Sequence, residues 1–317
     1  MKRGPRGGPG EVGVRLARAE RLVAEVHGVT RDPLLVLVAV LRHQQARAAI
    51  RSTTAEDGRA PPLGAPAPPG EVDEADEPQR SPENHRSPQD EGRADPVGLP
   101  AGPLLDLVAA APAVIDELAP AVEALRAAVP GALAEAGDHL RALAPSELAA
   151  VVETWLDDTA LVEPRLAFWF DVAASPILEP AARGLTAPAA WSGAACPICG
   201  GPPQASVIAE ESGEFMAGSP RSLVCGRCAS WWPFPRATCI GCGEDDSRRI
   251  TSFLPDDRRW ARVDTCSTCR SYVKTFDLRQ PGGVDVVPLV DDVATLTLDV
   301  WVQQRGYGRP VRSLAGV

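Results

Sequence analysis

The chain of 317 residues lacks any long run of apolar residues. The longest, Leu34 to Leu41, has eight residues, whereas a membrane-spanning helix needs about 18 or more. The start of the sequence is basic, but it is not followed by an apolar stretch of about 7–15 residues with a small-residue cleavage site. We therefore expect no membrane insertion and no secretion, and a cytoplasmic location.

The sequence also lacks an excess of positive charge. Its 32 basic and 42 acidic residues give a net charge of −10, which is a poor basis for binding a polyanion. The acidic excess is greatest in residues 102–190, with 13 acidic and 4 basic residues, whereas residues 191–317 carry 14 of each. Nucleic acid is therefore not the expected partner.

Residues 51–101 have no aromatic side chain and only four of Val, Ile or Leu. They hold ten prolines and eleven acidic residues instead. Such a stretch cannot bury enough apolar surface to offset the entropy lost on ordering. We expect a disordered linker or surface insertion here, and we assign it no chemistry.

Helical patterns flank this insertion. Apolar spacing predicts helices over 12–27 and 34–50, with Asp32 as the N-cap of the second and Pro33 in its first turn. Residues 103–185 are rich in Ala and Leu, and their prolines are expected to divide them into short helices, one of them capped by Ser146. β-Branched runs after residue 190 indicate short strands, and a last helix is expected from about Asp291 to Arg305.

All eight cysteines fall in the last segment, as four Cys-x-x-Cys pairs. The cytosol keeps thiols reduced, so metal binding is a better explanation than a disulfide framework. One Cys-x-x-Cys turn places two thiolates on a metal, and two turns complete a tetrahedral S4 site typical of zinc or mononuclear iron. The pairs are Cys196/Cys199, Cys225/Cys228, Cys239/Cys242 and Cys266/Cys269.

The spacing of the pairs favours sequential partners. The intervals are 25, 10 and 23 residues, and only the first and third comfortably hold a hairpin. We expect one site from the first two pairs and a second site from the last two, while an interleaved arrangement stays open. Gly200 and Gly243 follow the first and third pairs, where a free φ lets backbone N–H groups turn toward the sulfurs.

The predicted fold class is α+β. An N-terminal α-helical bundle is followed by tandem rubredoxin-like or zinc-ribbon modules of short β-strands and by a C-terminal helix. The expected division is residues 1–50 and 102–189 for the bundle, 51–101 for the insertion, and 190–317 for the metal-binding domain.

The residues around the cysteines resemble those of the FdhE family of formate dehydrogenase accessory proteins. The resemblance covers about residues 190–310. It is carried by Cys196-Pro197-Ile198-Cys199-Gly200, by Arg221-x-Leu223-x-Cys225 with Cys228 and Trp232, by Arg236 before Cys239, by Cys266-x-x-Cys269-x-x-Tyr272-x-Lys274, and by the tail from Asp291 to Tyr307.

This resemblance implies a cytoplasmic accessory or maturation factor that binds the catalytic subunit of a formate dehydrogenase and has no turnover of its own. It also implies two iron ions, one in each four-cysteine site, with zinc as the alternative. The eight cysteines are the implied ligands. The oligomeric state and the identity of the client enzyme stay open.

Aromatic and basic residues near the ligands are candidates for partner binding. If exposed, Trp231 and Trp232 would favour a protein interface. Arg236 and Tyr272 are the other two candidates for partner binding. The alternative is a tandem zinc ribbon that binds nucleic acid or serves as a general protein-interaction module. Its arginines, Arg248, Arg249, Arg258, Arg259, Arg262 and Arg270, are interspersed with aspartates.

Overall fold

The computed structural model describes residues 11–56, 103–188, 191–209, 221–311 and 313. Most of the predicted insertion lies outside the described residues. Its first six residues belong to helix α2 (Arg31–Glu56), which is therefore longer than predicted. That helix begins directly after a 3-10 turn, η1 (Gly28–Thr30), so Asp32 lies inside the first turn rather than at the N-cap.

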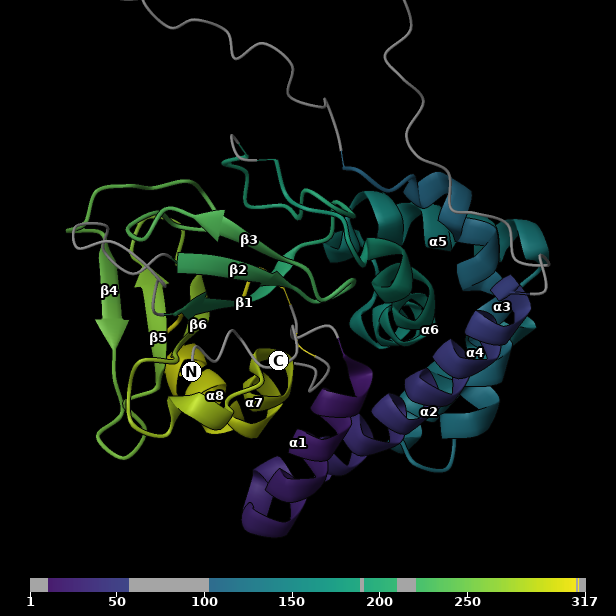
Figure 1. Ribbon diagram of the computed structural model, residues 1–317, viewed down its shortest axis with the longest axis horizontal. Coiled ribbons are helices and arrows are strands. Elements are labelled where there is room, and N and C mark those ends of the chain that lie inside the picture. Colours follow the sequence, from purple (N-terminus) through teal and green to yellow (C-terminus); the bar gives the residue numbers. More distant parts are fainter. Residues whose placement is uncertain (1–10, 57–102, 189–190, 210–220, 312, 314–317) are drawn as a thin grey trace, which may run out of the picture.

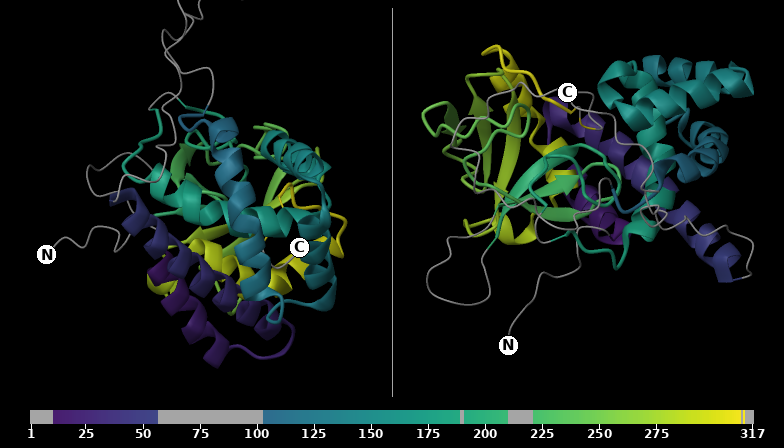
Figure 2. Two further views of the ribbon diagram at one scale, coloured as in Figure 1. Left: turned by 90° about the vertical axis from the view of Figure 1, so that its right-hand side faces the viewer. Right: turned by 90° about the horizontal axis from the view of Figure 1, so that it is seen from above.

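The two N-terminal helices pack on each other and on the C-terminal part of the chain. Helix α1 (Val12–Glu25) buries Ala19 and Leu22 against the apolar face of α2, and α7 (Pro288–Ala294) adds Val290 and Val293 to the same core. Figure 2 shows these purple helices beside the yellow C-terminal helices. The two ends of the described chain are thus joined.

Four further helices and a 3-10 turn form the helical part of the molecule. They are α3 (Leu107–Leu125), α4 (Gly131–Ala142), α5 (Pro145–Asp157), η2 (Thr159–Leu161) and α6 (Pro164–Ala182). The Asp106 carboxylate caps α3, and the Glu163 carboxylate caps α6. Helix α5 begins at Pro145, and the Glu147 carboxylate accepts the Ala144 N–H at 2.9 Å. The prediction of Ser146 as its cap is wrong.

The prolines divide this region only in part, because Pro130, Pro145 and Pro164 lie at the starts of α4, α5 and α6 but others do not. Pro112 and Pro120 lie inside α3, and Pro176 and Pro180 lie inside α6. A proline within a helix costs roughly 3 kcal/mol. Almost every residue of α6 from 167 to 179 is buried, and this packing supplies the stabilisation that keeps the helix continuous.

A single six-stranded sheet unites the two predicted metal modules (Figure 1). Its order is β3-β2-β1-β6-β5-β4, and every pairing is antiparallel except the central one, where Ser206 of β1 aligns with Thr275 of parallel β6. The strands are β1 (Pro203–Ile208), β2 (Arg221–Cys225), β3 (Trp231–Phe234), β4 (Ile250–Phe253), β5 (Ala261–Cys266) and β6 (Tyr272–Asp277). Each half of the sheet therefore carries two cysteine pairs.

Helices α7 and α8 (Leu296–Gln303) pack on one face of the sheet. They replace the single C-terminal helix expected from the sequence. The break is at Thr295, whose hydroxyl donates to the Asp291 carbonyl at 2.7 Å. A side-chain bond of this kind competes with the helical ladder. The 3-10 turn η3 (Gly283–Asp285) precedes this pair.

A buried ion network fastens the C-terminal helices to β6. Lys274 lies 2.9 Å from an Asp292 oxygen and 2.5 Å from an Asp299 oxygen, and all three side chains are fully buried. Arg309 binds the same two carboxylates, at 2.8 and 3.2 Å. Two cations thus balance two anions, as a buried charged cluster requires. This network gives a structural role to Lys274 and to two aspartates of the tail from Asp291 to Tyr307.

The largest core joins the helical part to the first half of the sheet. Trp155 and Trp169 lie in one continuous cluster with Leu223, Trp232 and the first four cysteines. The predicted α+β fold class is confirmed, and its first metal module is embedded between helices and sheet.

Candidate metal centres

The structure brings the eight cysteines together in the two predicted sets. In the first set, the Cys196 and Cys228 sulfurs are 3.7 Å apart, and the Cys199 and Cys225 sulfurs are 3.5 Å apart. The four sulfurs lie within 4.8 Å of one another, and all four residues are buried. We name this set centre 1.

The second set, centre 2, has the same size but a different environment. The Cys239 and Cys269 sulfurs are 3.6 Å apart, and the Cys242 and Cys266 sulfurs are 3.8 Å apart. Cys242 and Cys269 are exposed, whereas no residue of centre 1 is. The two centres therefore differ in their access to solvent.

Both centres fit a tetrahedral metal ion. Four sulfurs at about 2.3 Å from a common metal are separated by about 3.8 Å, close to the 3.5–3.8 Å found here. All eight cysteines are free, and these separations exceed the ~2.05 Å of a disulfide. The residues that would hold the metals are the eight cysteines, and an S4 ligand set suits zinc or mononuclear iron.

All four cysteine pairs adopt the same turn. In each, the N–H of the first cysteine donates to the carbonyl five residues later, as from Cys196 to Gly201 at 2.8 Å. The residue after the second cysteine always has positive φ. This residue is Gly200, Ala229, Gly243 or Arg270, with φ of 69°, 57°, 74° and 58°. The sequence indicated the two glycines, but the two non-glycine positions carried no local signal.

Backbone donors point at the sulfurs from within these turns. The Arg227 N–H donates to the Cys225 sulfur at 3.4 Å, and the Gly241 N–H donates to the Cys239 sulfur at 3.3 Å. Burial raises the pKa of Cys239, but hydrogen bonds from Ser271 and backbone N–H groups outweigh it and bring the pKa to about 7. Such donors stabilise thiolate, the form that binds a metal.

Centre 1 is more difficult to ionise without a cation. Hydrogen bonding to Cys196 raises the pKa of Cys199 well above its usual range, and burial does the same for the pKa of Cys225. Hydrogen bonds from the neighbouring thiols lower the pKa of Cys228. The cluster therefore favours one thiolate among several thiols, and a divalent cation would displace the remaining protons.

Comparisons with known proteins agree with this arrangement. The family described as "FdhE, C-terminal domain" matches residues 238–314. A protein FdhE homolog of Aquifex aeolicus is 29% identical over 180 residues, and one of Shewanella oneidensis is 39% identical over 113 residues. The crystal structure of the FdhE protein from Pseudomonas aeruginosa shares the fold, with a TM-score of 0.63 at 21% identity over 98% of this chain and 96% of that one.

These comparisons support the FdhE family through the C-terminal sequence and the shared fold. The matched region covers 56% of this chain and 62% of the Aquifex relative, but only 36% and 35% in the Shewanella comparison. No helix among the described residues is both long and apolar enough to cross a membrane.

The sequence gives no indication of one residue that connects centre 1 to the helices. Arg227 lies between Cys225 and Cys228 and is only 3% exposed. Its guanidinium donates to the Trp155 carbonyl at 2.5 Å, to the Leu156 carbonyl and to the Thr159 hydroxyl. Nothing in its local sequence shows which distant carbonyls it reaches.

The predicted partner-binding residues divide into two groups in the structure. Trp232 is 1% exposed and donates its indole N–H to the Gly193 carbonyl at 3.1 Å; Tyr272 is 1% exposed and donates to Asp299 at 2.8 Å. These two side chains are core residues. Trp231 is half-buried and Arg236 is exposed, so partner binding stays a prediction for them.

The arginines that suggested nucleic-acid binding have protein partners in several cases. Arg248 pairs with Asp246 at 2.7 Å, and Arg262 pairs with Asp264 at 2.9 Å. Arg270 lies over the Tyr307 ring, with its guanidinium carbon 4.0 Å from the centroid. These contacts leave a weak basis for a phosphate-binding face.

Proposed function

We propose that this FdhE-family chain is a cytoplasmic accessory factor needed to mature formate dehydrogenase, and that it binds the catalytic subunit of that enzyme. The observation that carries the proposal is the pair of complete four-cysteine centres on the FdhE fold. Four thiolates leave no open position for a substrate, which favours an accessory role over turnover. A reducing compartment suits eight free thiols.

We also propose that both centres hold iron, with zinc as the alternative. Iron held by four thiolates supplies one-electron redox chemistry, whereas zinc has none. The chain's own contribution is the same for either metal: eight sulfurs at fixed separations, turns that aim N–H groups at them, and a rigid connection from centre 1 to the helices.

Complementation tests the accessory role. The chain is expressed in a bacterium that retains a formate dehydrogenase but lacks its own FdhE-family protein, and formate-dependent dye reduction is measured. We expect the wild-type chain and the control Ser146→Ala to restore activity, and Cys199→Ser to restore less than a tenth of it. Failure of the wild-type chain would contradict the role, and full activity of Cys199→Ser would contradict the need for metal.

Affinity purification tests the partner directly. A tagged chain, purified without oxygen from a host that expresses formate dehydrogenase, is expected to retain the catalytic subunit. Recovery of the catalytic subunit equal to that on an untagged control resin would exclude a stable complex.

A further inference from the structure

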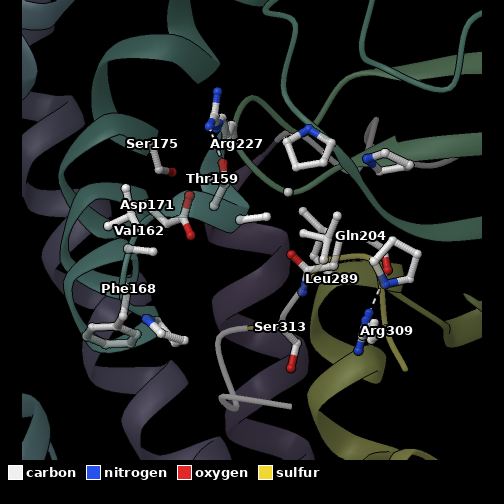
Figure 3. Close-up of a pocket in the computed structure, with 18 of the residues that line it drawn as sticks. Thr159, Val162, Phe168, Asp171, Ser175, Gln204, Arg227, Leu289, Arg309 and Ser313 are labelled. Atoms are coloured by element: carbon white, nitrogen blue, oxygen red, sulfur yellow. Dashed lines mark hydrogen bonds between the residues drawn. The ribbon is translucent and has the colours of Figure 1, made fainter. Parts of the chain in front are cut away.

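A large cleft separates the helical part from the sheet (Figure 3). Its volume is 1310 Å³, above the roughly 300–1,000 Å³ of ordinary small-molecule pockets. Residues of α2, η2 and α6 line one side, and the cysteine turns, α7 and the segment near Arg309 line the other. A cleft of this size between two parts of the chain accommodates a segment of polypeptide.

The cysteine turns of both metal centres contribute to this cleft. Gly200 follows the first pair, Gly226 and Arg227 lie inside the second pair, and Ile240 and Gly241 lie inside the third pair. Three of the four turns therefore border the same space. A molecule bound there contacts the backbone that surrounds centre 1 and centre 2 together.

The unpaired charges of the cleft are mainly negative. Three of its four arginines are neutralised by carboxylates, as Arg15 is by Glu179, Arg165 by Glu163, and Arg309 by Asp292. The fourth, Arg227, is bound by carbonyl and hydroxyl oxygens. The cleft carboxylates without an ion pair among the described residues are Asp32, Asp157, Asp158 and Asp171.

Asp171 is the innermost of these carboxylates. It projects from α6 into the cleft near Thr159 and Val162 (Figure 3), and its side chain makes no hydrogen bond or ion pair with any described residue. Burial raises its pKa to about 7, against the lowering effect of Arg227. A partly buried carboxylate without a partner lowers the free energy of unfolding, and a bound cation that pairs with it would offset this loss.

The surroundings of Asp171 determine what kind of cation fits. Val162 and Phe168 are buried beside it, and Leu289 faces it from the other side of the cleft. A basic side chain has an apolar stem and a charged end, so it matches an apolar wall that ends in a carboxylate. Apolar residues on either side of that basic residue would pack against the other apolar walls of the cleft.

We propose that the cleft binds an extended segment of a partner polypeptide in which a basic side chain, flanked by apolar residues, pairs with Asp171. The segment then lies along the cysteine turns of both metal centres. This gives the proposed accessory function a binding surface, and it rests on that function only for the identity of the partner.

Fluorescence anisotropy with the full, metal-loaded chain tests the proposal. The probe is a fluorescein-labelled, amide-capped Leu-Ala-Arg-Ala-Leu peptide, and its control has neutral citrulline in place of arginine. We expect the arginine peptide to bind the wild-type chain at least tenfold more tightly than the citrulline peptide. No binding up to about 1 mM, or equal binding of the two peptides, would overturn the proposal.

Two variants separate the carboxylate from general charge and from folding. Asp171→Asn is expected to abolish the arginine preference, whereas Asp116→Asn, which removes an exposed charge from α3, should keep it. The melting temperature of Asp171→Asn should not fall, because the replaced carboxylate has no partner to lose. An unchanged preference in Asp171→Asn would overturn the assignment.

The outcomes also separate this proposal from the accessory role. A chain that selects the arginine peptide but fails complementation contradicts the accessory role alone. A chain that complements but does not discriminate between the peptides contradicts the cleft proposal alone.

Discussion

The guanidinium carbon of Arg227, in a cysteine turn of centre 1, lies 4.1 Å from the ring centroid of Trp155 in helix α5. The same guanidinium donates to the Trp155 and Leu156 carbonyls at the end of that helix. The turn that places Cys225 and Cys228 at the metal site thus also holds the helical part against the sheet. Metal binding at centre 1 and docking of the helices share one structural element.

Removal of this side chain should destabilise the whole molecule. Arg227→Ala removes the guanidinium that donates to the Trp155 and Leu156 carbonyls and its cation–π contact with Trp155, so we expect the free energy of unfolding to fall by about 2–4 kcal/mol. Urea denaturation followed by tryptophan fluorescence measures this. The control Arg248→Ala removes an exposed, ion-paired arginine and should cost less than about 1 kcal/mol. Equal effects of the two changes would contradict the role of Arg227.

The two metal centres should differ in lability. Cys242 and Cys269 are exposed, whereas the ligands of centre 1 are buried, so a chelator reaches centre 2 first. We expect metal release to be biphasic, with one metal lost at least tenfold faster than the other. The fast phase should be absent from Cys242→Ser, and Cys199→Ser should retain it. A single phase that releases both metals together would contradict this difference.

Asp171→Asn should stabilise the chain above pH 7. The pKa of Asp171 is raised by burial to about 7, so the folded state holds a proton that the unfolded state releases between about pH 4 and 7. The contribution of Asp171 to the free energy of unfolding therefore falls as the pH rises from about 4 to 7. Because Asn stays neutral, we expect the variant to gain roughly 1–3 kcal/mol relative to the wild type between pH 5 and pH 8. Denaturation of both chains at pH 5 and at pH 8 measures this gain. A variant less stable than the wild type at pH 8 would contradict it.

The buried ion network should depend on its charge balance. Lys274→Met leaves Arg309 as the one cation among the described residues that pairs with Asp292 and Asp299, and the uncompensated buried charge should cost about 3–5 kcal/mol. The double variant Lys274→Met/Asp299→Asn restores one cation to one anion and should recover part of that loss. Thermal unfolding of the three chains provides the comparison. A double variant less stable than Lys274→Met would contradict the role of charge balance in this network.

The parts of this molecule that could be predicted from its sequence are those set by local spacing. The intervals between cysteine pairs favoured sequential partners because only a long interval holds a hairpin, and the structure groups them in that way. Apolar periodicity indicated the helices. Both signals lie within short windows, and neither depends on distant contacts.

The remaining features depend on contacts between residues far apart in the chain. The parallel pairing of β1 with β6 joins segments about 70 residues apart and makes one sheet from two modules. Pro176 stays inside α6 because the surrounding core holds that helix. Arg227 and Asp171 acquire their roles only when the sheet and helices meet around the cleft. No local pattern encodes these relationships.

Native mass spectrometry of the chain, purified without oxygen from cells supplied with iron and zinc, tests the central claim most directly. The account predicts two metal ions for each wild-type chain, one for Cys199→Ser or Cys242→Ser, and iron as the metal. A wild-type chain that carries no metal, or variants that still carry two, would contradict it.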